Sequence, residues 1–93
     1  MKTNYLPQPT PEELKQEFKY FCRVIIDIPT KPGAMINCAK AYAEAGLGLW
    51  TAKEITTQIL YILANLSTWR GEQARTTKAS LRELHNKINA ELS

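Results

Sequence analysis

Apolar residues recur at alternating spacings of four and three along this chain, and this spacing is the strongest constraint on its fold. In the first such segment they form one stripe on one face of a helix: Leu14, Phe18, Phe21, Cys22, Ile25 and Ile28. Thr10, Pro11 and Glu13 add a capping residue, a proline at the first helical position and a glutamate three residues after the cap. These signals predict a helix over residues 11–28.

A β-branched run near the end of this segment supports a second interpretation. Val24, Ile25 and Ile26 lose side-chain freedom in a helix and suit a strand. A strand over residues 22–28 would make the fold α+β with one strand. The sequence leaves both interpretations open.

A second helix is predicted over residues 32–45. The stretch from Pro29 to Gly33 marks a turn before it. Alanines dominate the segment, so a neighbouring helix could approach it closely. At its end, Gly46 followed by Leu47 resembles a left-handed glycine stop.

Two more helices are predicted in the second half of the chain. Thr51 and Glu54 form a capping box that starts the third helix at Ala52, and this helix ends near residues 67–68. Leu60 widens its apolar stripe. A short connection at residues 69–71 leads to a last helix over about 72–91, so these two helices should be antiparallel neighbours.

Four amphipathic helices with short connections predict an all-α fold, a small four-helix bundle. We expect residues 11–93 to form a single helical domain. Residues 1–10, with prolines at positions 7 and 9, predict an extended proline-rich arm before it. A chain of 93 residues with 44% hydrophobic content has room for one folded domain and no more.

Residues suited to catalysis are few. His85 is the single histidine, Asp27 is the single aspartate, and no motif pairs a nucleophile with a base. Cys22 and Cys38 match no metal-ligand spacing, and we interpret both as buried apolar fillers. We therefore expect a protein that is not an enzyme and that holds no metal or cofactor.

The net charge of +3 indicates a mildly basic surface, which permits binding to nucleic acid without requiring it. No apolar run resembles a signal peptide or approaches the roughly 20 residues of a membrane span. We expect a cytoplasmic protein with no membrane partner.

Aromatic residues near the predicted helix ends are candidates for binding a protein. Tryptophan, tyrosine and arginine are over-represented among residues that carry interface energy. The partner-binding candidates are Trp69, Arg70, Tyr61 and Trp50, with Tyr5 in the arm as a further one. These residues favour a non-enzymatic protein-interaction module. A bundle of this size could also complete its core as a homodimer.

A basic stripe on the last helix supports an alternative function. Arg75, Lys78 and Arg82 recur at spacings of three and four, and His85 follows three residues later. Residues so placed could contact successive phosphates, which would suit a small nucleic-acid-binding regulator. The competing interpretation is an ordinary solvated helix face.

One segment resembles a stretch found in small accessory proteins of phages and mobile elements. The segment is residues 61–74, Tyr-Ile-Leu-Ala-Asn-Leu-Ser-Thr-Trp-Arg-Gly-Glu-Gln-Ala, and the resemblance covers roughly residues 52–84. Proteins of that origin often bind host machinery, and anti-CRISPR inhibitors are one such group. The resemblance implies an anti-defence inhibitor whose partner is a host protein complex, a nucleic-acid machine.

A second segment resembles the start of ACT domains, which are small amino-acid-sensing modules. It comprises residues 28–35, Ile-Pro-Thr-Lys-Pro-Gly-Ala-Met, together with residues 41–47. In that family an Asp-Lys-Pro-Gly-Ala turn lies at the ligand site, and here Thr30 stands in place of the aspartate. The resemblance implies a ligand site bordered by Lys31 and Gly33.

Overall fold

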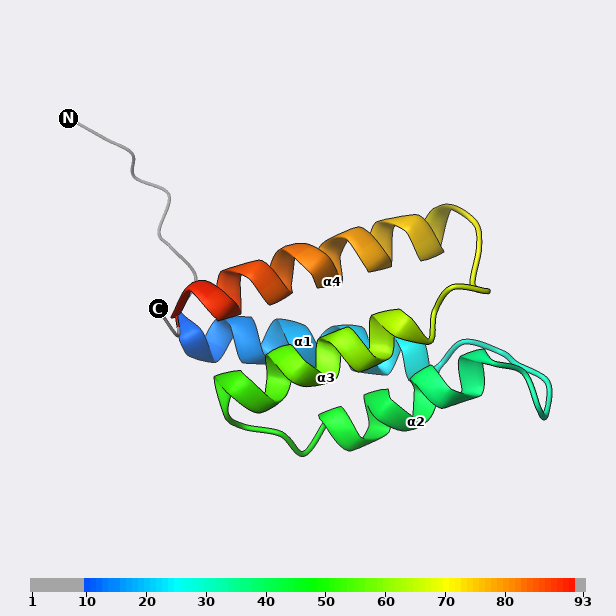
Figure 1. Cartoon of the computed structure of the whole chain (residues 1–93), viewed down its shortest axis with the longest axis horizontal. Coiled ribbons are helices and arrows are strands. Elements are labelled where there is room, and N and C mark those ends of the chain that lie inside the picture. Colours follow the sequence, from blue (N-terminus) through cyan, green and yellow to red (C-terminus); the bar gives the residue numbers. More distant parts are fainter. Residues whose placement is uncertain (1–9, 92–93) are drawn as a thin grey trace.

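A computed structural model of the chain describes residues 10–91, which form four α-helices (Figure 1). The helices are α1 (Pro11–Ile26), α2 (Ile36–Gly46), α3 (Ala52–Ala64) and α4 (Glu72–Glu91). No strand occurs in this part of the chain. The all-α prediction is confirmed. The predicted arm and Tyr5 lie outside the described residues, apart from Thr10.

The interpretation of residues 22–28 as a strand is wrong, because α1 continues to Ile26. Cys22 and Ile25 complete the buried stripe of the helix, and burying that stripe outweighs the small helix penalty of the β-branched residues. The predicted capping box is also confirmed. The Glu13 backbone N–H donates to Thr10 Oγ1 at 3.1 Å, and the Thr10 N–H donates to a Glu13 carboxylate oxygen at 2.8 Å.

Helix α2 begins at Ile36 and not at residue 32, because side-chain hydrogen bonds hold the preceding residues in a loop. The Thr30 hydroxyl donates to the Asn37 side-chain oxygen at 2.6 Å, and the Asn37 amide group donates to the Lys31 carbonyl at 2.9 Å. Gly33 has a φ of 83°, a left-handed conformation that an α-helix does not contain. These contacts fix the loop against the first turn of α2.

Gly46 does not end α2 as a left-handed glycine, so that prediction is wrong. It is the last residue of the helix, and its φ is not positive. A Cβ at this position would lie 2.8 Å from Phe18 Cζ and 3.0 Å from Cys22 Sγ. The glycine is therefore needed for the close approach of α2 to α1.

Helices α3 and α4 begin where the sequence predicts. The Thr51 hydroxyl accepts from the Glu54 N–H at 3.2 Å. Helix α3 ends at Ala64, earlier than predicted, and the Asn65 side chain donates to the Tyr61 carbonyl at 2.8 Å in its last turn. Gly71, with a φ of 107°, makes the turn into α4.

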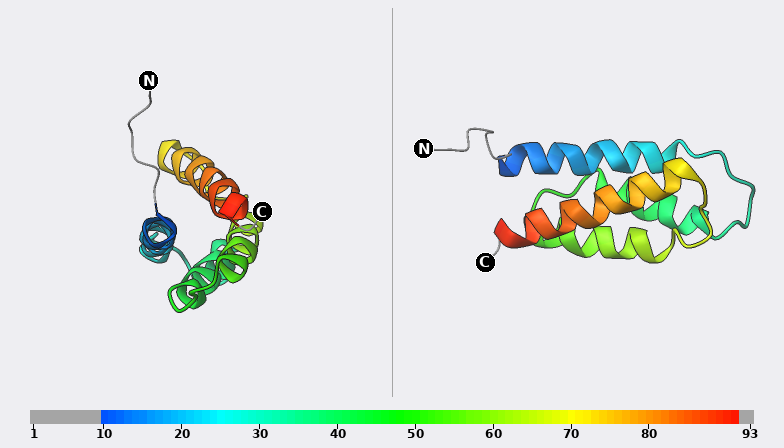
Figure 2. Two further views of the ribbon diagram at one scale, coloured as in Figure 1. Left: turned by 90° about the vertical axis from the view of Figure 1, so that its left-hand side faces the viewer. Right: turned by 90° about the horizontal axis from the view of Figure 1, so that it is seen from above.

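The four helices surround one core in the order α1, α2, α3, α4, as the end-on view shows (Figure 2). Each helix packs on the next one in the chain and runs antiparallel to it, and α4 closes the ring against α1. The largest fully buried side chains are Phe18, Ile25, Ile55, Ile59, Ile62, Leu66, Leu81, Leu84 and Cys22. No helix of the described part has the length and apolar character needed to cross a membrane.

Candidate functional site

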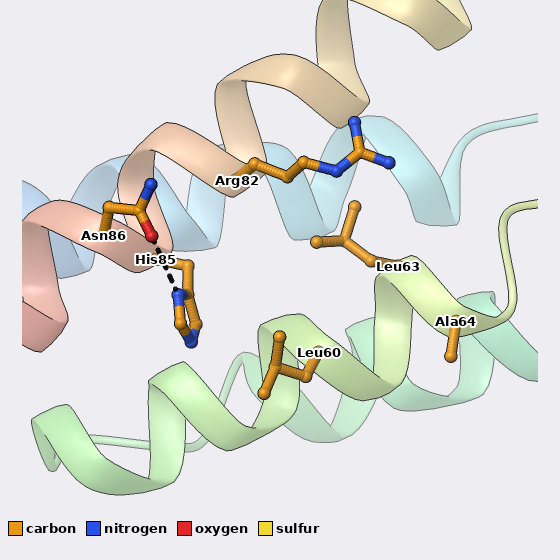
Figure 3. Close-up of a pocket in the computed structure, with 6 residues that line it drawn as sticks. All are labelled: Leu60, Leu63, Ala64, Arg82, His85 and Asn86. Atoms are coloured by element: carbon orange, nitrogen blue, oxygen red, sulfur yellow. Dashed lines mark hydrogen bonds between the residues drawn. The ribbon is translucent and has the colours of Figure 1, made fainter.

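A groove of about 480 Å³ opens between α3 and α4 (Figure 3). One wall is apolar and belongs to α3, and the other is polar and belongs to α4. The lining residues are Leu60, Leu63, Ala64, Arg82, His85 and Asn86. The groove is open to solvent along its length, so it suits a segment of another chain better than an enclosed small molecule.

The apolar wall follows from the helical spacing of α3. Ile59 and Ile62 face the core, whereas Leu60, Leu63 and Ala64 lie on the side that borders α4 and solvent. Leu60, which the sequence places in the buried stripe, is 53% exposed. A leucine this exposed gains little from folding.

The polar wall carries a cation that has no partner among residues 10–91. The Arg82 side chain is exposed and extends along the groove toward Leu63 (Figure 3). It makes no hydrogen bond or ion pair with any residue between 10 and 91. His85 Nδ1 lies 3.4 Å from the Asn86 side-chain oxygen. None of the lining residues is acidic.

An exposed aromatic pair continues the apolar surface from α3 to α2. Tyr61 stacks on Tyr42 with ring centroids 5.3 Å apart and an angle of 28° between the planes. Tyr61 is 51% exposed, and Tyr42 is also exposed. We call Tyr42, Leu60 and Tyr61 the apolar strip.

The structure does not bring the four predicted partner-binding residues together. None of the four lines the groove, and Tyr61 is the one that follows a lining residue, Leu60, in the chain. Trp69 is half-buried against the core at the far end of α3, and Arg70 is exposed next to it. Trp50 lies before the start of α3, at the opposite end of the bundle (Figure 1).

Trp50 has a structural partner that the sequence did not reveal. The Lys19 ammonium of α1 lies 3.4 Å from the centroid of the Trp50 ring. Lys19 is only 6% exposed, so the indole covers a nearly buried charge. This cation–π contact is sufficient to explain the 57% exposed tryptophan.

The predicted basic stripe lies on α4, but its three cations differ in their contacts. Arg75 forms an ion pair with Glu72 at 3.1 Å. The Lys78 ammonium donates to the Trp69 carbonyl at 2.7 Å. Arg82 is the member of the stripe that keeps its charge available to a ligand.

A second pocket of about 320 Å³ lies between the α1–α2 loop and the α3–α4 connection. Lys31 and Trp69 line it from the two sides, and Ile28 and Ala34 add apolar surface. Gly33 is exposed in the same loop but does not line the pocket.

The two cysteines occupy different environments, so the prediction of two buried fillers is half wrong. Cys22 is buried, and desolvation raises the pKa of its thiol to about 12, against smaller opposing effects of Arg23 and Lys19. Cys38 is exposed on α2. Within residues 10–91 no three His, Cys, Asp or Glu side chains are grouped so that they could hold a metal ion.

Comparison with family models, curated proteins and solved structures finds no match for this chain. The resemblances to phage accessory proteins and to ACT domains therefore stay predictions from the sequence. The chemistry of the groove follows from its own residues, which offer an apolar wall for side chains and a cation for an acidic group.

Proposed function

We propose that this chain is a non-enzymatic protein-interaction module that binds its partner through the α3–α4 groove and the apolar strip. The observation that carries the proposal is the exposed apolar wall around Leu60, bordered by Arg82, which pairs with no residue in the described part of the chain. An exposed apolar patch rimmed by polar groups is typical of a protein-binding surface.

The distribution of exposed apolar side chains supports this choice of surface. The large hydrophobic residues exposed in the described part of the chain are Tyr20, Met35, Tyr42, Trp50, Leu60 and Tyr61. Three of these six form the apolar strip, and Trp50 covers Lys19. Tyrosine and arginine are also the residue types that contribute most often to interface energy.

The finer proposal is that the partner is a protein of a host nucleic-acid machine and that the chain is an inhibitor carried by a phage or mobile element. Its support is the local resemblance of residues 61–74. This segment spans the end of α3, the connection and the start of α4. It includes Leu63 and Ala64 of the groove wall. We place this activity in the cytoplasm.

Direct nucleic-acid binding is the alternative to the proposed protein-interaction function. A phosphate backbone requires several available cations in a row. The Lys78 ammonium is bound by the Trp69 carbonyl, and Glu72 places a negative charge 3.1 Å from Arg75. The contacts of α4 therefore favour a protein partner.

A photo-crosslinking experiment tests the proposal. A benzoylphenylalanine replaces Tyr61 in one variant and Tyr20 of α1, which is 60% exposed, in the control variant. Both variants are irradiated in host lysate with and without nuclease. We expect a defined protein adduct from position 61, unaffected by nuclease and lost when Leu60→Glu is added. Equal adducts from both positions, or adducts to nucleic acid alone, would contradict the proposal.

A further inference from the structure

The shape of the α3–α4 groove restricts what can occupy it. Two antiparallel helices form its walls, and Leu60, Leu63 and Ala64 project at spacings of three and four residues. A third helix packs well on such a surface, because its own apolar residues recur at the same spacing. An extended strand has no free sheet edge to join, since residues 10–91 contain no strand.

The charges around the groove restrict the occupant further. From residue 55 to residue 71 the chain carries a single charge, and that charge is Arg70. Across the groove stands Arg82, which has no partner among the described residues. His85 is the other ionisable lining residue, and no carboxylate lines the groove. An acidic side chain on the occupant would therefore meet a cation and no like charge.

The side chains of the groove and of the apolar strip favour a helix over a nucleic acid as the occupant. Leu60 and Leu63 form a surface that cannot hydrogen-bond to phosphate oxygens. Tyr42 and Tyr61 stack on each other, so neither ring presents both faces to a base. One unengaged arginine suits one carboxylate better than a row of phosphates.

We infer that the groove binds an acidic amphipathic helix of a protein partner. Apolar residues three or four apart on that helix pack against Leu60 and Leu63. A glutamate or aspartate beside them pairs with the Arg82 guanidinium. The inference rests on the proposed function and adds the chemistry of the partner to it.

Selection of peptides from a random 15-residue mRNA-display library on the full chain tests this inference. Selections are run in parallel on the wild type and on the variants Arg82→Glu and Leu60→Glu. Lys87→Glu is the matched control, because it makes the same charge change on α4 and lies about 140° around the helix from Arg82. Circular dichroism verifies that every variant keeps its helix content.

We expect the enriched peptides to carry leucine or phenylalanine at helical spacing together with glutamate or aspartate. Their affinity should fall about tenfold or more in Arg82→Glu and in Leu60→Glu and stay unchanged in Lys87→Glu. Selection on Arg82→Glu should instead enrich peptides with lysine or arginine beside the apolar residues, because the charge of the groove is reversed.

The variants separate failure of the inference from failure of the proposed function. Peptides that lose affinity in Leu60→Glu but not in Arg82→Glu, or that are not acidic, overturn the acidic partner and leave the interaction surface in place. If no enriched peptide depends on Leu60, both the inference and the proposed surface are wrong. Tighter binding of a 20-base-pair DNA or RNA duplex than of any selected peptide would support the nucleic-acid alternative.

Discussion

Because α2 lies so close to α1 at Gly46, we expect the substitution Gly46→Ala to destabilise the folded protein. At most helical positions this change is stabilising by up to about 1 kcal/mol, because alanine restricts the unfolded chain more than glycine does. At position 46 the new Cβ would lie 2.8 Å from Phe18 Cζ, where ordinary contact begins at 3.4 Å. Either the Phe18 ring or the α2 backbone must therefore move by more than half an ångström.

The surrounding core decides the size of the effect. Phe18 and Cys22 are both fully buried, so neither side chain can turn into solvent to make room. Adding a methyl group to a filled core costs about 1–3 kcal/mol. Subtracting a helix-propensity gain of about 1 kcal/mol leaves a net destabilisation of about 0–2 kcal/mol. For a domain of this size, each 1 kcal/mol of destabilisation lowers Tm by roughly 4–8 °C.

Urea and thermal unfolding, followed by circular dichroism, measure the effect. Gly48→Ala is the control, because its new Cβ would meet nothing closer than the Ala45 carbonyl oxygen at 3.8 Å and its φ is not positive. We expect Gly48→Ala to be neutral or stabilising by up to about 1 kcal/mol. Gly46→Ala should thus be the less stable of the two glycine variants.

A double-mutant cycle identifies the clashing side chain. Phe18→Leu removes the ring carbon that lies closest to the new methyl group. Gly46→Ala should therefore cost less in the Phe18→Leu background than in the wild type. If Gly46→Ala stabilises the protein, or costs the same in both backgrounds, the steric explanation for this glycine is wrong.

Four further predictions concern side chains away from the groove. In the native protein at pH 8, Cys38 should react quickly with a thiol reagent and Cys22 only after unfolding; two fast thiols per chain would contradict this. The folded state retains the Cys22 proton up to a pKa of about 12, whereas the unfolded thiol releases it near 9.0, so stability falls as pH rises between these values. Cys22→Ala should flatten that fall in urea titrations at stepped pH. Trp50→Ala should cost about 1 kcal/mol in the wild type and less in a Lys19→Met background, and a coupling energy of zero would refute the cation–π contact. Thr10→Ala should lower the free energy of unfolding by about 1 kcal/mol and Thr10→Ser should leave it nearly unchanged, as measured by urea denaturation.

The parts of the fold that depend on residues close together in the sequence could be predicted. The caps at Thr10 and Thr51 and the buried spacing along α1 are local signals, and the structure confirms them. The start of α2 and the end of α3 depend on local side-chain hydrogen bonds that the sequence did not reveal, whereas the error at Gly46 arises where distant segments meet. Gly46 looks like a helix stop until Phe18, a residue of another helix, is placed against it.

The candidate site was harder to predict for the same physical reason. The sequence singled out Arg82 as part of a basic stripe but gave no reason to separate it from Lys78, whose ammonium is bound by the Trp69 carbonyl. The exposure of Leu60 could have been predicted from its position in the sequence. Buried residues of α3 such as Ile59 follow the core spacing, and a leucine next to that series must face outward or toward a neighbouring helix.

The closure of the helix ring by its first and last members has a consequence for how the bundle opens. Helices α1 and α4 meet although residues 27–71 separate them, whereas α3 and α4 are joined by residues 65–71. Closing the longer loop costs about 1.5 kcal/mol more chain entropy than closing the shorter one. The contact between α1 and α4 should therefore form late in folding and separate early in local unfolding. The α3–α4 hairpin, which holds the groove, can stay paired during such an opening, so a transient release of α1 leaves the proposed binding surface intact.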